Sequence, residues 1–339
     1  MPESPQIKIA LLGCGNIAQA HWRGIQTHAP QLKVTAAIDI DPARAAEMAE
    51  QTGGQPYTSL QSALQQGDFE AVDIMLPHHI HEETAKLAFA AGKHVILEKP
   101  MATTLDACQR ILAAAQAAGT VFMVAEQAQY WPDAVKVQQL IQEGAVGEII
   151  TARAFFGGWA STGWGENPWR FDKAITGGGI TIDGGAHWIR PLRMWLGEID
   201  EVVAVLDHPL QEMEGESLAH AIFRFKSGKL AVFTALSAGS ASALGEDFRV
   251  TGTEGIIVIE KGRDGRVLLY DEDHRQGLEI MPPGEKGKGA FGLELADFAQ
   301  AILTGTPLAA GPEESLGELR TALAMYRSAE SKQWEKVWY

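Results

Sequence analysis

Short apolar runs alternate with longer amphipathic stretches through the first third of the chain. The run Ile7–Leu12 and the run at 95–97 have the length of buried strands. Gly92 stands where a helix would stop, and Pro100, which has no backbone N–H, follows a strand. Further strands are predicted at 33–38, 70–76 and 120–125. Helices are predicted at 16–27, 59–66 and 82–91, and a fourth is capped by Thr103 or Thr104 and runs to 118. Strands that alternate with helices in this way form a parallel, doubly wound sheet.

The pattern changes after residue 126. Strands with alternating apolar residues are predicted at 148–156, 200–206, 218–225, 230–236, 248–251, 256–260 and 267–270. Helices are predicted at 132–143, 291–303 and 313–331, and a loop at 281–289. Turn signals at 227–228 and 253–255 join neighbouring strands into hairpins, which is typical of an α+β domain. We therefore predict an α/β dinucleotide-binding domain at 1–125 and a substrate-binding and oligomerisation domain at 126–339.

The hairpin sheet needs a cover on the face that carries no helices. Its strands contain several large apolar residues, namely Ile222, Phe223, Phe225, Val232 and Phe233. Such a face indicates a contact between subunits, so we expect a homodimer or a homotetramer formed through this sheet. The sequence leaves both sizes open.

Composition narrows the class of protein. The net charge of −15 over 339 residues argues against binding to nucleic acid. No apolar run reaches the roughly 18 residues of a membrane span, and the N-terminus lacks the pattern of a signal peptide. Cys14 and Cys108 both lie in apolar surroundings, which fits a reducing compartment. We expect a cytoplasmic protein without a disulfide framework.

A glycine-rich turn follows the first strand. Gly13, Gly15 and Ala18 form the pattern G-x-G-x-x-A, with Asn16 and Ile17 opening a helical stretch. Gly13 permits the tight turn, Gly15 lets a diphosphate approach the backbone, and Ala18 keeps helix and strand close. Free N–H groups at the start of the helix favour the phosphates. This context predicts a dinucleotide site.

An acidic residue ends the second strand, 24 residues after Gly15. Asp39 can accept hydrogen bonds from both ribose hydroxyls, and its charge repels a 2′-phosphate. The alternative role of helix cap suits Asp41 better, because Pro42 follows it. We therefore expect NAD as cofactor, with NADP less favoured.

Polar residues follow two further strands of the predicted parallel sheet. Glu98 and Lys99 come directly after the run at 95–97, where open α/β sheets bind ligands. An exposed ion pair at a strand end is the simpler alternative. Pro77 and His78 follow the preceding strand and are expected near the nicotinamide, and His81 begins the next helix and is assigned to the same cofactor site.

The histidines at 78, 79 and 81 suggest a metal site at first sight. No further cysteine or acidic ligand stands at a fitting spacing, so no metal is predicted.

Asp183 and His187 form the candidate catalytic pair of the second domain. Three glycines at 177–179 suggest a flexible approach to a helix, and a spacing of four places both side chains on one face of that helix. A carboxylate one turn from a histidine can fix its tautomer and raise its basicity. The alternative is a helix cap followed by an exposed polar residue.

The loop at 157–172 is rich in tryptophan. Trp159, Trp164 and Trp169 suit a lid whose rings lie against the C–H face of a sugar, although they can equally pack on their own domain. Glu126 ends the last strand of the first domain and is expected to line the same pocket.

The chain resembles the glucose-fructose oxidoreductase/inositol dehydrogenase (Gfo/Idh/MocA) family over nearly its whole length. The resemblance rests on the glycine turn at 13–18, His21, the segments 77–81, 91–95, 98–100 and 177–179, Asp183, His187 and the segment 311–314. It implies a nicotinamide-binding domain, an open and mainly antiparallel second sheet, oligomers, and a last helix that packs back near the first domain. It also implies redox chemistry at a carbinol carbon of a sugar, a polyol or a related ring.

The resemblance further places three side chains at one carbinol. Asp183 and His187 would share the active site with Lys99, and Arg170 would meet the substrate. His187 would take the hydroxyl proton, while Lys99 would bind the hydroxyl oxygen and stabilise its negative charge. The base role can also pass to Lys99, because an enclosed lysine can have its pKa lowered.

One departure from the family concerns the residues after His187. Arg190 stands where many relatives have an acid, and Pro191 follows it. Arginine there would favour a substrate with a carboxylate or phosphate, or it would point to a partner subunit. Two rival functions stay open at this point, a redox-neutral glycoside hydrolase or lyase and a non-catalytic regulator that senses the cofactor.

Overall fold

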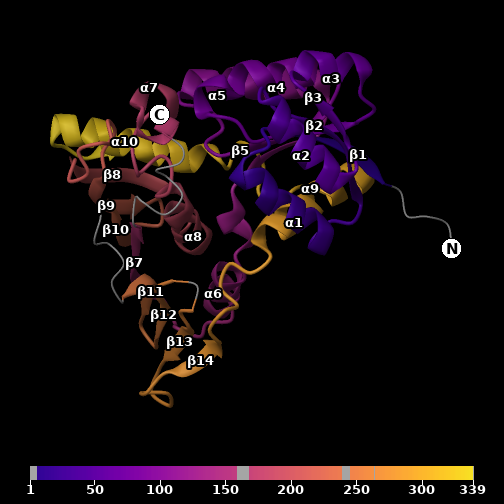
Figure 1. The fold of residues 1–339 in the computed structure, drawn as a ribbon. Coiled ribbons are helices and arrows are strands. Elements are labelled where there is room, and N and C mark those ends of the chain that lie inside the picture. The colour runs from indigo at the N-terminus through magenta and orange to yellow at the C-terminus, as the bar shows by residue number, and fades with distance from the viewer. Residues whose placement is uncertain (1–5, 159–167, 239–244, 263, 339) are drawn as a thin grey trace. The chain divides into compact units, whose positions relative to one another are not determined.

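The protein folds into two compact units (Figure 1). The computed structural model describes residues 6–158, 168–238, 245–262 and 264–338. The first unit comprises residues 1–127 and 289–316, and the second comprises 128–288 and 317–339. The chain therefore leaves the first unit, builds most of the second, and returns to each of them once.

The returning segment differs from the sequence-based prediction, which placed all of 126–339 in the second domain. Helix α9 (Ala290–Thr304) packs beside α1 (Asn16–His28) in the first unit, as Figure 1 shows. The last helix, α10 (Leu316–Ser331), lies almost entirely in the second unit. The segment that completes the first unit is thus α9.

The first unit is built on a six-stranded parallel sheet, which confirms the Rossmann prediction. Its strands are β1 (Ile7–Leu12), β2 (Leu32–Ile38), β3 (Gln55–Tyr57), β4 (Ala71–Ile74), β5 (His94–Glu98) and β6 (Phe122–Ala125). They lie in the order β3-β2-β1-β4-β5-β6. The short edge strand β3 had not been predicted, because Gln-Pro-Tyr has neither an apolar run nor an alternation.

The carboxyl ends of these strands are level with one another. Leu12 of β1 lies opposite Ile38 of β2 and Ile74 of β4, and Ile74 lies opposite Leu97 of β5. The chain proceeds from β1 to one side and resumes on the other side with β4, so the strand order reverses between them. Open α/β sheets bind their ligands at such a point.

Local capping explains where the helices of the first unit begin. They are α1, α2 (Pro42–Thr52), α3 (Leu60–Gln66), α4 (His81–Ala90) and α5 (Leu105–Ala118), with α9 added from the end of the chain. The side chain of Asp41 accepts the N–H of Ala43, and that of Thr104 accepts the N–H of Ala107. Asp41 is therefore the cap of α2, which leaves the neighbouring Asp39 to another role.

The second unit is built on a nine-stranded sheet. Its strands are β7 (Ile149–Gly158), β8 (Ile199–Asp207), β9 (Leu218–Phe225), β10 (Leu230–Ser237), β11 (Glu246–Gly252), β12 (Ile256–Glu260), β13 (Val267–Tyr270), β14 (Leu278–Met281) and β15 (Glu335–Lys336). Only β7 and β10 pair in parallel, so the sheet is mainly antiparallel, as predicted. Helices α6 (Pro132–Gln142), α7 (Lys173–Thr176), α8 (Ala186–Leu196) and α10 belong to this unit. β14 and β15 had not been predicted.

The apolar residues that were assigned to a subunit contact lie on both faces of this sheet. Phe223, Phe225 and Phe233 are at most 1% exposed and belong to the core of the unit, so their assignment to a subunit contact was wrong. Ile222 and Val232 lie opposite each other in register and are 40% and 47% exposed. Because side chains alternate between faces along a strand, the phenylalanines and these two residues point to opposite sides.

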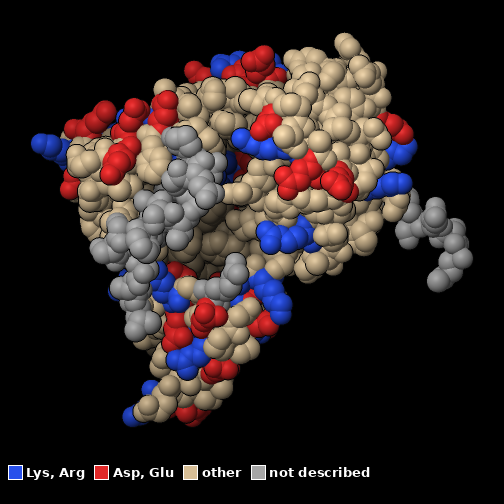
Figure 2. Space-filling view, viewed as in Figure 1, with Lys and Arg blue, Asp and Glu red and all other residues tan. Residues whose placement is uncertain are grey.

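Charged side chains on the molecular surface are mixed in sign. On the face shown in Figure 2, lysine and arginine are interspersed with aspartate and glutamate. Local ion pairs such as Arg110–Glu82 and Arg266–Glu260, each 2.7 Å long, are part of this mixture. None of the helices in the described ranges has the length and apolar character needed to cross a membrane.

Candidate active site

The glycine turn has the geometry that a diphosphate needs. Gly13 has a φ of 93°, and a Cβ atom there would lie 2.3 Å from the carbonyl oxygen of Met75, so only glycine fits. Gly15 precedes the first residue of α1, and no side chain in the described part of the chain caps this helix. A Cβ atom on Gly15 would meet nothing within 4 Å. The N-terminus of α1, where Asn16 and Ile17 lie, thus has no side-chain cap in the described residues, and the Cβ position of Gly15 is open.

Asp39 lies beside this turn. Its carboxylate accepts the N–H of Cys14 at 2.9 Å and the N–H of Asp41 at 2.9 Å, and the residue is 7% exposed. Each oxygen keeps a second lone pair for a ribose hydroxyl. The turn and Asp39 thus fit a dinucleotide, and they hold each other in place.

Cys14 and Ile40 lie next to Asp39 at this edge of the sheet. Burial raises the pKa of the Cys14 thiol to about 12, so it is not a reactive thiolate. Ile40 is 92% exposed, which is unusual for a large apolar side chain. The sequence analysis had not singled it out, because a single isoleucine after a strand carries no pattern.

The histidines after β4 are buried in the structure. His78 follows Pro77 in a short 3-10 turn (His78–Ile80) and is 3% exposed. His81 is fully buried, and its ring nitrogens lie 2.9 Å from the carbonyl oxygen of Pro100 and 2.8 Å from that of Leu76. We therefore correct the assignment of His81 as a cofactor ligand, since its ring joins the ends of two strands instead.

Glu98 and Lys99 continue the same edge at the end of β5. The Oε2 atom of Glu98 accepts the backbone N–H of Lys99 at 3.1 Å, and Oε1 lies 3.2 Å from Nε2 of His21. Nδ1 of His21 lies 2.8 Å from Oδ2 of Asp73 on β4, and both side chains are fully buried. The Glu98 carboxylate is therefore tied down and is not a loose surface group beside the half-buried Lys99.

Glu126 was predicted to line the pocket, and its environment is enclosed. It follows β6, donates its N–H to the carbonyl oxygen of Val124 and is 3% exposed. Its assignment to the substrate stays a prediction.

Asp183 lies in a turn, which corrects the prediction that it shares a helix with His187. Helix α8 begins only at Ala186, and the Asp183 N–H bonds to the carbonyl oxygen of Gly179 at 3.3 Å. The Asp183 carboxylate accepts a charge-assisted bond of 2.5 Å from Arg170. Two of the residues predicted to meet the substrate from this unit, Arg170 and Asp183, thus belong to one ion pair.

His187 and Trp169 each make a contact through the ring. His187 is half-buried in the first turn of α8, with its ring centroid 6.2 Å from that of Trp131. The guanidinium of Arg170 lies over the ring of Trp169 at 4.6 Å. Trp159 and Trp164 lie outside the described residues.

Two of the three glycines at 177–179 are needed for close packing, which corrects the prediction of a flexible approach, while Gly177 ends α7 with a φ of 82°. A Cβ atom on Gly178 would lie 2.0 Å from Oη of Tyr326, and one on Gly179 would lie 2.0 Å from the carbonyl oxygen of Glu216. The Glu216 carboxylate accepts the N–H groups of Gly179 and Thr181 at 3.0 and 2.9 Å. This network fixes the turn that carries Asp183.

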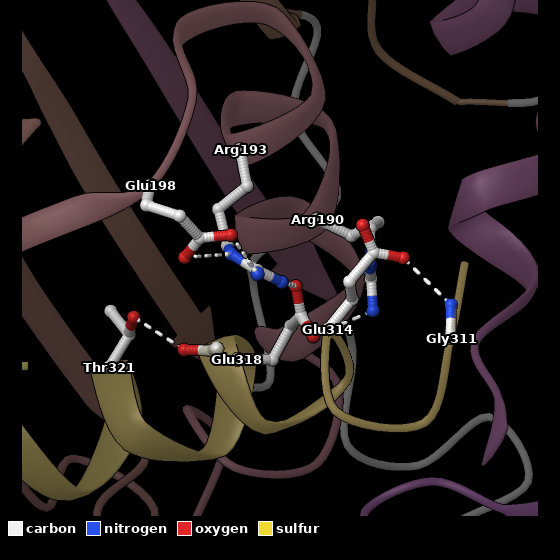
Figure 3. Close-up of polar contacts among 8 residues, drawn as sticks. Arg190, Arg193, Glu198, Gly311, Glu314, Glu318 and Thr321 are labelled. Carbon is white, nitrogen blue, oxygen red and sulfur yellow. Dashed lines mark hydrogen bonds and ion pairs between the residues drawn. The ribbon is translucent and has the colours of Figure 1, made fainter. Parts of the chain in front are cut away.

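Arg190 is buried in an ion-pair cluster, shown in Figure 3. It donates to Glu318 of α10 at 2.9 Å and is 3% exposed. Arg193, one turn further along α8, pairs with Glu318 and also with Glu198, the latter at 2.5 Å. Arg190 had suggested a substrate pocket with a positively charged wall, but its guanidinium is paired with Glu318 instead. Pro191 lies inside α8, which continues to Leu196.

Metal ligands were not expected from the sequence. In the ranges that the structure describes, no group of three or more histidine, cysteine, aspartate or glutamate side chains is arranged to hold a metal ion.

Comparison with known proteins assigns the family. Residues 7–126 match the model of an oxidoreductase family with an NAD-binding Rossmann fold, and residues 134–258 match the GFO/IDH/MocA C-terminal domain. The chain belongs to the GFO/IDH/MocA family of oxidoreductases. The resemblance stated from the motifs is thereby confirmed, and so is the prediction of an oxidoreductase with an NAD-binding Rossmann domain.

Individual relatives are distant but cover nearly the whole chain. Levoglucosan dehydrogenase of Pseudarthrobacter phenanthrenivorans is 29% identical over 88% of this chain and 90% of its own length. The 1,5-anhydro-D-fructose reductase of Ensifer adhaerens is 28% identical over 95% of this chain and 96% of its own. A solved levoglucosan dehydrogenase in complex with NADH superposes with a TM-score of 0.84 at 25% identity, covering 98% of this chain and 99% of that one.

Proposed function

We propose that this protein is an NAD-dependent dehydrogenase or reductase that acts on a carbinol carbon of a sugar or a cyclitol. The observation that carries the proposal is the position of Lys99. It follows β5 at the same sheet edge as the glycine turn after β1 and Asp39 after β2. A cation at this edge is available both to the substrate and to the cofactor.

The first unit supports NAD over NADP. Asp39 places a negative charge beside the turn that fits the diphosphate, and a 2′-phosphate would face that charge. The exposed side chain of Ile40, directly after Asp39, offers an apolar surface to an adenine ring. His78 and Pro77 follow β4, next to β1 in the sheet, and we assign them to the nicotinamide half of the cofactor.

The second unit supplies the remaining chemistry in this proposal. When bound, the nicotinamide accepts or donates the hydride of the carbinol carbon. His187 removes the hydroxyl proton during oxidation and returns it during reduction. Lys99 binds the hydroxyl oxygen and stabilises its negative charge. The convergence of Lys99 and His187 on one carbinol stays a prediction.

Asp183 has a narrower task than the sequence suggested. Its ion pair with Arg170 orients the carboxylate, which accepts a hydrogen bond from a neighbouring hydroxyl of the substrate in this proposal. The face of Trp169 is held by the same guanidinium and suits the C–H side of a sugar ring. Such a pair of contacts recognises a polyhydroxylated ring without requiring a charged substrate.

The relatives support a cyclic carbohydrate as substrate. One acts on levoglucosan and another on 1,5-anhydro-D-fructose, by their names. The proposal is tested with a panel of sugars, cyclitols and their glycosides, assayed with NAD and with NADP by absorbance of the reduced cofactor. Substrate turnover without net formation of NADH would instead identify the redox-neutral hydrolase or lyase, and the absence of any turnover across the panel would contradict the proposal.

We also propose that the protein forms a homo-oligomer through the exposed face of its nine-stranded sheet. Four apolar side chains that share one face of this sheet by register are 40% to 70% exposed, namely Val205, Ile222, Leu230 and Val232. A contiguous apolar face of this kind is rare on a monomer. Light scattering after size exclusion, over a range of protein concentrations, tests the assembly and gives its size.

A further inference from the structure

A buried cluster of ionisable side chains lies inside the first unit and is connected to Lys99. It comprises His21 from α1, Asp73 from β4, Glu98 from β5 and Glu294 from α9. The side chains of His21, Asp73 and Glu294 are fully buried, and that of Glu98 is 13% exposed. Buried charged side chains lower the stability of a protein relative to apolar side chains of similar size. Packing alone therefore does not explain why this cluster is present.

A close contact between two glycines places Glu294, the fourth residue of the cluster, beside His21. A Cβ atom on Gly24 of α1 would lie 2.8 Å from the backbone nitrogen of Gly292, and one on Gly292 would lie 2.9 Å from the Gly24 carbonyl oxygen. The two helices therefore touch backbone to backbone, side by side as seen in Figure 1. Glu294 follows Gly292 by two positions, and its Oε1 lies 3.7 Å from Nε2 of His21.

The geometry around His21 specifies its charge. Nδ1 lies 2.8 Å from an oxygen of Asp73, and Nε2 lies 3.2 Å from an oxygen of Glu98. Ionised carboxylates only accept hydrogen bonds, so a ring held between two of them donates from both nitrogens as an imidazolium. Burial raises the pKa of Asp73, and the charge of His21 opposes this rise. Burial by itself lowers the pKa of His21, but Asp73 and Glu98 outweigh burial and raise that pKa well above its usual range.

Glu294 is the uncharged member. Within the described residues neither of its oxygens has a hydrogen-bond partner, and both N–H groups of His21 are already directed to other carboxylates. Burial raises the pKa of Glu294 well above its usual range; His21 opposes this, and the carboxylates of Glu98 and Glu126 add to it. A neutral Glu294 shields the charged pairs from water without adding another negative charge.

We propose that His21 is a positioning residue for the reaction at Lys99. Held by Asp73, its imidazolium fixes the Glu98 carboxylate, whose other oxygen accepts the backbone N–H of Lys99. The cluster thereby sets the point from which the Lys99 side chain leaves the sheet edge. This inference rests on the proposed role of Lys99.

Two carboxyl-to-amide variants beside the same imidazole form a matched pair. Asp73→Asn removes an anion that keeps the ring charged, so the bond from His21 to Glu98 loses its charge assistance and no longer holds the Lys99 backbone as firmly. A displacement of about 1 Å costs on the order of 100-fold in rate, so we expect kcat to fall about 10- to 100-fold. Glu294→Gln replaces a neutral acid with a neutral amide, and its kcat should match that of the parent protein. In both variants the Kd for NADH, measured by fluorescence, should stay within about threefold, because the glycine turn and Asp39 are untouched.

The charge of the ring is read directly by NMR of protein with isotope-labelled histidine. The His21 signal is identified by its absence in His21→Gln. In the parent protein and in Glu294→Gln it should show the doubly protonated ring at a pH above the ordinary histidine pKa of about 6.5, whereas in Asp73→Asn it should show a neutral ring there. This measurement on the parent protein and Glu294→Gln decides the charge state even where Asp73→Asn does not fold.

Further controls separate positioning from general damage and from the proposed function. Ile111→Ala on α5 removes a fully buried side chain of the same unit and should lower the melting temperature without lowering kcat at a temperature well below it. The inference is overturned by a neutral His21 in the parent protein, by equal effects of the two amide variants, or by parental kcat in Asp73→Asn. If Lys99→Ala is inactive while Asp73→Asn is fully active, only the positioning role fails. If Lys99→Ala retains parental activity, Lys99 has no role in the reaction and the positioning role of His21 fails with it, whereas the proposed function fails only if the parent protein turns over no compound of the panel.

Discussion

The buried ion pairs of α8 allow a stability prediction with a calculated size. Glu318 of α10 accepts from Arg190 and Arg193, and all three side chains are at most 6% exposed (Figure 3). Burial by itself lowers the pKa of Arg193, but Glu318 and Glu198 outweigh burial and raise it above its ordinary value. Glu318→Gln keeps the volume of the side chain and removes its charge, so a guanidinium loses its buried anion.

Breaking a buried pair from one side costs about 3–5 kcal/mol. The second unit has roughly 180 residues, and its entropy of unfolding near the melting temperature is therefore about 0.4 kcal/mol/K. A loss of about 4 kcal/mol then lowers the melting temperature of this unit by about 10 °C, or by about 6 °C if both units unfold together. Calorimetry at low protein concentration measures this change and also shows whether the units unfold separately.

A matched variant is available on the same arginine. Glu198 also pairs with Arg193, but its side chain is 36% exposed, so Glu198→Gln should cost only about 1 kcal/mol or less. Equal melting temperatures for the two variants, or a change below about 2 °C in Glu318→Gln, would refute the assignment of a buried charge pair. Arg190→Met should likewise lower stability while leaving the ratio of kcat/KM for anionic and neutral sugars unchanged. A selective loss of activity on anionic sugars with unchanged stability would restore Arg190 to the substrate wall.

Four further predictions address the site, the assembly and the buried acid. Lys99→Ala should lower kcat by at least about 100-fold while NADH still binds, as measured by kinetics and fluorescence titration, and parental kcat would remove Lys99 from the mechanism. Asp39→Ala should weaken the binding of NAD about 10- to 100-fold more than the binding of NADP. The ratio of the two Kd values is the quantity to compare, because damage to the glycine turn would weaken both cofactors alike. Val232→Arg should shift the light-scattering mass toward the monomer, and an unchanged mass would exclude this face from the contact. The pKa of Glu294 is raised in the folded state, so the contribution of this residue to stability falls as the pH rises above about 4.3. The melting temperature of Glu294→Gln should therefore be higher than that of the parent protein at about pH 8 and close to it at about pH 4.

Much of the fold could be predicted because its signals are local. Apolar runs such as Ile7–Leu12 define strands by themselves, and caps such as Asp41 and Thr104 define where helices begin. The glycine turn at 13–18 was recognisable because strand, turn and helix follow one another without interruption. The return of α9 to the first unit was not predictable in this way, because its signal, the close contact of Gly24 and Gly292, joins residues far apart in sequence.

The candidate site was predicted in part, for the same reason. Lys99 and Asp39 could be assigned because each directly follows a strand. The role of Asp73 could not, since an acid inside the buried strand β4 becomes meaningful only when His21 is seen beside it. The role of Gly178 was predicted wrongly. The sequence suggested a flexible backbone there, whereas the structure shows that no side chain would fit beside Tyr326.

Both units place buried charges next to the segments that carry the proposed chemistry. In the first unit the imidazole of His21 ties Glu98, and through it the backbone of Lys99, to the centre of the sheet. In the second unit Arg190, one turn after His187, anchors α8 to α10 through Glu318. Apolar side chains would pack these positions at less cost, but they would allow sliding that directional, charge-assisted bonds resist. A hydride transfer that depends on the separation of reacting atoms gains from such rigidity, because small displacements of Lys99 or His187 translate into large losses of rate.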